Sequence, residues 1–110
     1  MEIDIEKVLN FIRDNAEKYA QAKANRIYVE EFKSSLLARL MQASQMNGVS
    51  SAAGQERDSK SSVEYTDHLK AISEAVQAEE SLKCMLIAAQ AKIEVWRTIK
   101  ASERVEARNI

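Results

Sequence analysis

The chain contains no proline and only two glycines, Gly48 and Gly54, in 110 residues. Proline costs roughly 3 kcal/mol inside a helix, and β-sheet folds need the frequent turns that glycine and proline form. A chain almost free of both residues can form long uninterrupted helices and is poorly suited to an all-β fold. Its length is about that of one domain. We therefore expect an all-α fold.

Two long segments carry apolar residues at steps of three or four, the spacing that places side chains on one face of a helix. The sequence predicts a first helix over residues 4–46, with Asp4 as N-cap and a stop at Gly48. It predicts a second helix over residues 62–107, capped by Ser61 or Ser62. Residues 47–60 lack periodicity and are rich in serine, alanine and glycine, which indicates a flexible connector.

These elements predict one helical-hairpin domain over residues 1–110, in which two long helices pack antiparallel. Hydrophobic residues make up 45% of the chain, which is more than one stripe on each helix can use. Because two helices cannot enclose a core, we expect the hairpin to form a homodimer and a four-helix bundle. The side chains expected to widen the apolar face are Leu9, Leu37, Met41, Met85 and Ile87.

Two acidic residues, Glu79 and Glu80, fall within the apolar stripe of the second helix. Folding the hairpin at the connector places them opposite Arg26, and places Trp96 opposite Phe11. A charged pair of this kind adds little net stability, but it can fix the register of two helices. The alternative is that both glutamates lie on a solvated flank, because the phase of a helix drifts along a long stripe.

Few side chains are available for catalysis or for metal binding. The only histidine, His68, excludes a His–His metal site and a conventional catalytic triad, and we expect it at the surface. The only cysteine, Cys84, cannot form an intrachain disulfide, which is typical of a cytoplasmic protein, and we expect it to be buried. The sequence predicts no enzyme, no cofactor and no metal site.

Charge and hydropathy exclude two further classes. The 16 basic and 17 acidic residues give a net charge of −1, so no overall field attracts nucleic acid or a membrane. The N-terminal residues "MEIDIEKVLN" lack the apolar region of a signal peptide. The longest strongly apolar stretch, "CMLIAAQA", is far shorter than the roughly 20 residues that span a bilayer.

The end of the second helix carries a basic stripe of Arg97, Lys100, Arg104 and Arg108 beside Trp96. Such a stripe could follow a phosphate backbone while the indole stacks on a base. The alternative is ordinary, because basic residues favour the C-terminus of a helix and the interleaved glutamates can pair with them. We therefore expect nucleic-acid binding to be weak, and a protein partner to be the better ligand for this stripe.

Three segments resemble small uncharacterised helical proteins of tailed bacteriophages and prophages: "AKANRIYVEEFKSSLLARLM", "YTDHLKAISEAVQAEESLK" and "WRTIKASER". The resemblance covers most of both predicted helices and implies no catalytic residues. It implies a non-enzymatic phage protein in a bacterial cytoplasm, which binds a phage or host protein of DNA metabolism. The second hypothesis is direct nucleic-acid binding through the basic stripe.

Overall fold

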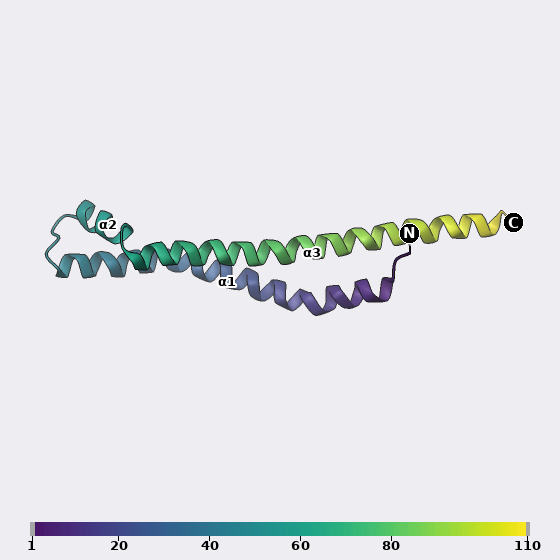
Figure 1. Ribbon diagram of the computed structural model, residues 1–110, viewed down its shortest axis with the longest axis horizontal. Helices are drawn as coiled ribbons and strands as arrows, with labels where there is room; N and C mark the ends of the chain where they lie inside the picture. The colour runs from purple at the N-terminus through teal and green to yellow at the C-terminus, as the bar shows by residue number, and fades with distance from the viewer. Residues whose placement is uncertain (1, 110) are drawn as a thin grey trace. The chain divides into compact units, whose positions relative to one another are not determined.

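The computed structural model describes residues 2–109, and within that range it contains three helices and no β-strand. They are α1 (Ile5–Met46), α2 (Ala52–Lys60) and α3 (Val63–Arg108) (Figure 1). The all-α prediction is therefore confirmed. Contacts divide the chain into unit 1 (Met1–Gln21 and Glu80–Ile110) and unit 2 (Ala22–Glu79).

Within each unit, α1 and α3 run antiparallel. In unit 1, Val8 packs against Ala89 and Ile93. In unit 2, Arg26 forms an ion pair with Glu79. Further along α1, the Lys33 ammonium lies over the ring of Tyr65, near the start of α3. The antiparallel pairing expected from the sequence is thus present in both units.

The caps of the two long helices form as the sequence predicts. The backbone N–H of Lys7 donates to Asp4 Oδ1 at 3.1 Å, so Asp4 caps α1. The backbone N–H of Tyr65 donates to Ser62 Oγ at 3.2 Å, so Ser62 caps α3. Ser61 is instead the C-cap of α2.

Gly48 ends α1 with a φ of 101°, a conformation that residues with a side chain rarely adopt. The N–H of Gly48 donates to the carbonyl of Gln45, and the N–H of Val49 donates to the carbonyl of Ser44, both at 3.1 Å. This pair of bonds is the Schellman motif, which satisfies the last carbonyl groups of a helix. The predicted stop at Gly48 is confirmed.

Replacing Gly48 with alanine should destabilise the protein by about 1–2 kcal/mol, the cost of a left-handed conformation for a residue with a Cβ. An added Cβ meets no atom within 4 Å, so backbone strain is the whole effect. Urea unfolding followed by circular dichroism measures it. Gly48→Asn should lose less, because asparagine tolerates this conformation better. Equal stability of wild type and Gly48→Ala would contradict the prediction.

The expected connector contains a helix, so the prediction of residues 47–60 without regular structure is wrong for Ala52–Lys60. Ser51 caps α2 through its side chain, which accepts a backbone N–H from the first turn. Gln55 is buried, and its Nε2 donates to the carbonyl of Val49 at 2.9 Å. Because α2 is held by polar side chains, it carries no apolar stripe from which it could be predicted.

The register of the long helices differs from the expectation near the start of α3, although Arg26 pairs with Glu79 as expected. Lys33 lies over the ring of Tyr65, 6.0 Å from its centroid, so α3 begins beside the middle of unit 2's part of α1. The last turns of α1 therefore extend beyond the start of α3, whereas the sequence predicted that α3 would pair with these turns. In unit 1, Phe11 packs against the cluster of Val8, Ala89 and Ile93 and lines a groove with Met85.

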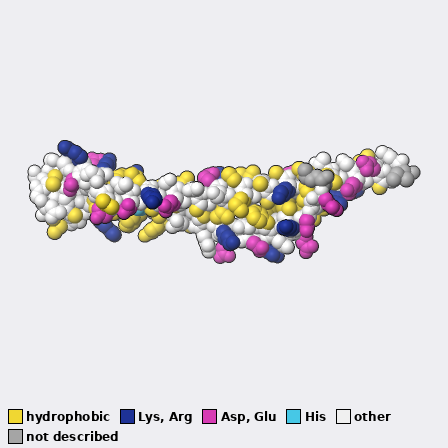
Figure 2. Space-filling model, viewed as in Figure 1, with side chains coloured by type: hydrophobic (Ala, Val, Ile, Leu, Met, Phe, Trp, Pro, Cys, Tyr) yellow, Lys and Arg dark blue, Asp and Glu magenta, His cyan; other side chains and the backbone are white. Residues whose placement is uncertain are grey.

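Few hydrophobic side chains are buried. They are Val8, Tyr65, Ala75, Ala89 and Ile93, and among the described residues no side chain is less than 2% exposed. Large hydrophobic side chains reach the surface instead, as the yellow atoms in Figure 2 show. Those that remain exposed are Leu9, Ile27, Tyr28, Met46, Val63, Leu69, Met85, Ile87, Val95 and Val105.

Candidate binding surfaces

Unit 2 contains an aromatic cluster formed by Tyr28, Phe32, Tyr65 and His68. The rings of Tyr28 and Phe32 stack with centroids 6.1 Å apart and planes 14° apart, as their spacing of one helical turn permits. Phe32 also contacts the His68 ring across the helix pair, at 5.7 Å and a tilt of 58°. Tyr28 is 66% exposed, so the cluster presents an aromatic ring to solvent.

The aromatic cluster is held in place from α3. His68 Nε2 donates to the carbonyl of Val29 at 2.7 Å, which fixes the imidazole ring against Phe32. His68 is half-buried, so the expectation that it lies on the surface is wrong. Its hydrogen bond gives it a structural role in orienting the ring that Tyr28 stacks upon.

Two cations lie over rings of the aromatic cluster. The Arg39 guanidinium is 5.4 Å from the centroid of Phe32, and the Lys33 ammonium is 6.0 Å from that of Tyr65. Both distances are within the range of a cation–π interaction. Neither cation forms an ion pair with another described residue. The face therefore combines an exposed ring with positive charges that a ligand could contact.

The predicted pair in the helix seam forms between Arg26 and Glu79. Arg26 Nη2 donates to Glu79 Oε1 at 3.2 Å, and Arg26 Nε donates to Glu79 Oε2. Arg26 Nη1 also donates to Glu30 Oε2 at 3.0 Å. The Glu79 side chain is 7% exposed and that of Arg26 is 25% exposed, so this is a half-buried, bidentate ion pair.

Glu80 has a different position from Glu79. It is exposed and takes part in none of the ion pairs among residues 2–109. The solvated-flank alternative therefore describes Glu80 and is wrong for Glu79. The hydrogen bonds to Glu79 and then to Glu30 raise the pKa of Arg26 above its ordinary value, because both bonds favour the charged guanidinium.

The basic stripe at the end of α3 is partly neutralised. Arg97 Nη1 pairs with a Glu94 oxygen at 3.1 Å, and Lys100 Nζ pairs with a Glu103 oxygen at 3.2 Å. Arg104 and Arg108 are exposed and form no ion pair with another described residue. The stripe thus offers two unpaired cations, and not the four that the sequence pattern contains.

Trp96, which the nucleic-acid hypothesis would stack on a base, is half-buried. The ring is therefore less accessible than that of Tyr28, which is 66% exposed. A stacking platform needs an open ring face. Among the aromatic residues, Tyr28 meets this requirement best.

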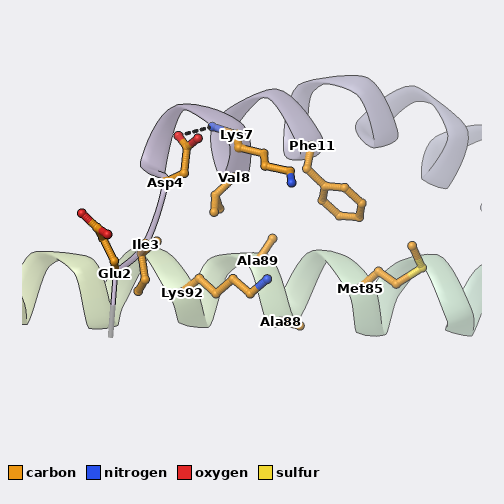
Figure 3. Close-up of a pocket in the computed structure, with 10 residues that line it drawn as sticks. All are labelled: Glu2, Ile3, Asp4, Lys7, Val8, Phe11, Met85, Ala88, Ala89 and Lys92. Atoms are coloured by element: carbon orange, nitrogen blue, oxygen red, sulfur yellow. Dashed lines mark hydrogen bonds between the residues drawn. The ribbon is translucent and has the colours of Figure 1, made fainter.

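Unit 1 contains a groove with a volume of about 590 Å³. It lies between α1 with its N-terminal extension and α3, and it is drawn in Figure 3. Lys7 and Lys92 extend toward its centre from opposite helices, and neither pairs with a carboxylate of a described residue (Figure 3). Its other lining residues are Glu2, Ile3, Asp4, Val8, Phe11, Met85, Ala88 and Ala89.

The described part of the chain groups no three His, Cys, Asp or Glu side chains in a way that could hold a metal ion. Cys84 is exposed, so the expectation that it is buried is wrong. Within residues 2–109, none of the helices is both long and apolar enough to span a bilayer. The surfaces with distinctive chemistry are therefore the aromatic cluster, the groove and the end of α3.

The sequence did contain signals for the aromatic cluster. Tyr28 and Phe32 are four residues apart, and Tyr65 and His68 are three apart, so each pair lies on one helix face. The two faces meet only in the observed register, in which His68 lies beside Val29 and Phe32. The register expected from the sequence would place His68 about two helical turns further along α1. No known protein family, curated protein or solved structure matches this chain.

Proposed function

We propose that this chain is a non-enzymatic binding protein whose ligand is another protein, docked on the aromatic cluster of unit 2. The observation that carries the proposal is the Tyr28 ring, 66% exposed and stacked on Phe32, with Arg39 over the same Phe32 ring. Tyrosine and arginine are enriched among the residues that contribute most to protein–protein affinity. A ring already fixed by stacking loses little conformational entropy when it is covered.

The charges near the aromatic cluster favour a protein over nucleic acid. Glu31 lies on α1 close to Lys33, and Glu64 and Asp67 lie on the first turns of α3, beside the Tyr65 ring that Lys33 covers. Nucleic-acid surfaces need a clear excess of positive charge, because affinity comes largely from neutralised phosphates. A mixed surface suits a protein partner that presents an apolar or aromatic side chain and a carboxylate for Arg39. The resemblance to phage proteins is the ground for placing this partner among phage or host proteins.

We also propose that the chain is a homodimer that forms a four-helix bundle. Within residues 2–109, ten large hydrophobic side chains are exposed and five hydrophobic side chains are buried. An apolar surface of this extent is typical of chains that bury it against a partner. Two antiparallel helices from each copy supply the four helices that such a bundle requires.

Changing Tyr28 or Arg39 to alanine should weaken partner binding about tenfold or more, as expected for hot-spot side chains. Pull-down of the tagged protein from a bacterial host identifies the partner, and calorimetry with the purified partner measures the affinity. Met46→Ala is the matched control, because Met46 is 82% exposed on the same helix but outside the aromatic cluster. This control should bind like the wild type.

A second variant, Arg97→Glu with Arg104→Glu, separates this surface from the basic stripe. We expect it to keep the partner. Loss of the partner in this variant, with retention in Tyr28→Ala, would move the site to the end of α3. Tight, salt-dependent binding of a labelled oligonucleotide by the wild type, abolished by either set of changes, would replace the protein partner with nucleic acid.

A further inference from the structure

A stripe along α3 in unit 1 has the spacing of a coiled-coil seam. Its steps alternate between three and four residues, as in heptads. Met85 is 46% exposed and Val95 is 41% exposed, so α1 leaves this stripe largely uncovered. We call it the α3 stripe, and it is formed by Met85, Ala88, Lys92, Val95, Ile99, Ser102 and Glu106.

The groove of unit 1 and a shallow surface depression near the end of α3 both lie along the α3 stripe. Met85, Ala88 and Lys92 line the groove described above. Ser102 and Glu106 line a second, smaller hollow, together with Ala101 and Val105. The small side chains of Ala88 and Ser102 leave room at the two ends of the stripe for larger side chains of a partner helix.

The last turns of α3 have no packing partner among the described residues. Every residue from 100 to 109 is exposed, although α3 stays helical to Arg108. A short helical segment without tertiary contacts is marginal in water, because most helical stability in proteins comes from packing. A neighbouring helix could pack on these turns, and a helix end could occupy the groove, whose lining includes Lys7 and Lys92.

The charges of the α3 stripe indicate which helix fills both roles. Lys92 lies in its first half and Glu106 in its second half, with Glu103 next to Ser102. In a parallel pair of α3 helices, each Lys92 would face the other Lys92, and each Glu106 the other Glu106, which is repulsive. In an antiparallel pair centred between Val95 and Ile99, the lysine of each copy comes within one turn of the acids of the other.

We propose that a second copy of this chain binds along the α3 stripe, antiparallel, with the two-fold axis between Val95 and Ile99. The exposed end of each α3 then lies over the groove of the other copy, where Lys7 and Lys92 receive Glu103 and Glu106 of the second copy. The contact is isologous and closed, because the same residues meet twice. This inference rests on the proposed homodimer, but it pairs the two copies through the ends of α3, so that each end lies beside the helix pair of the other copy, and does not place all four helices side by side.

The single cysteine tests the direction of pairing directly. Cys84 is exposed and lies 13 residues from the proposed axis, so two copies should hold their Cys84 residues about 40 Å apart along the antiparallel helices. This distance can be measured by attaching a nitroxide label to Cys84 and applying pulsed electron–electron double resonance. A parallel pair would bring the labels within about 15 Å, given the spacing of 8–10 Å between packed helices. A distance in that short range, or any distance clearly different from 40 Å, overturns the proposal.

Sedimentation equilibrium of charge variants tests the surface. Lys92→Glu and Glu106→Lys should each weaken the dimer about tenfold or more, since the two-fold axis doubles each repulsion, and the double variant should recover most of the affinity. Lys83→Glu is the control, because Lys83 lies on the opposite face of α3, and it should leave the dimer unchanged. A wild type that stays at 12.4 kDa at micromolar concentration defeats the homodimer itself. A dimer that ignores Lys92 and Glu106 defeats only the α3 stripe.

Discussion

Replacing Arg26 with methionine is expected to lower the stability of the chain more than any other single replacement of a charged residue. Methionine keeps an unbranched apolar side chain but removes the two bonds from the guanidinium to Glu79. The Glu79 carboxylate, 7% exposed, then loses the two hydrogen bonds from Arg26 while most of its burial remains. Removing one member of a buried ion pair costs more than the net value of the pair. Urea unfolding at fixed protein concentration measures the loss.

A double-mutant cycle of Arg26→Met and Glu79→Leu measures the interaction energy between the two side chains. Removing both charges should restore much of the stability lost in Arg26→Met, because a buried pair replaced by apolar residues is close to neutral. The control is Arg97→Met with Glu94→Leu, an ion pair whose side chains are 65% and 61% exposed. Its single changes should have small, additive effects. Additive effects of Arg26→Met and Glu79→Leu would show that the pair does not couple the helices.

Truncating Ile93 to alanine should destabilise the protein by about 2–4 kcal/mol, a large share of the roughly 5–15 kcal/mol that stabilises a typical domain. Ile93 is 9% exposed and forms the core of unit 1 with Val8 and Ala89. The loss combines the apolar surface of the removed methyl groups with the contacts that Ile93 makes in this cluster. Amide hydrogen exchange should show the loss of protection concentrated in unit 1.

The matched control is Ile87→Ala, the same substitution on the same helix. Ile87 is 59% exposed, so its truncation should change the free energy of unfolding by less than about 0.5 kcal/mol. Ile87 also lies outside the α3 stripe, so the control keeps the proposed dimer. Similar losses of unfolding free energy in Ile93→Ala and Ile87→Ala would contradict the conclusion that Ile93 belongs to a stabilising core in unit 1.

Local hydrogen-bonding demands made the helix ends predictable. Asp4 and Gly48 stand where a helix needs an acceptor at its start and a left-handed residue at its end, and both positions are confirmed. The Arg26–Glu79 pair was predictable for a similar reason, since a charge within an apolar stripe needs a partner. The sequence did not determine which of Glu79 and Glu80 faces Arg26. The two residues differ by about 100° around the helix, and the phase of a long helix is not known to that accuracy from hydrophobic spacing.

The pairing of α1 with the start of α3 was not predictable, because the segment that joins them contains α2. This helix has few apolar side chains, and Gln55 and Ser59 are buried through hydrogen bonds rather than through an apolar face. A polar helix of nine residues looks like a connector to any reading based on hydrophobic spacing. Missing α2 displaced the pairing of α1 with α3, and with it the contact between Phe32 and His68.

The sparse interior has a consequence for how such a chain evolves. Few of the described residues are buried, and four of those, Ser44, Gln55, Ser59 and Glu79, are polar. Most positions face water, where a substitution that keeps helix propensity changes stability little. Selection for folding alone therefore constrains a small set of sites, and the rest can drift freely between generations. Descendants of this chain would keep their helices long after most of their residues had been exchanged.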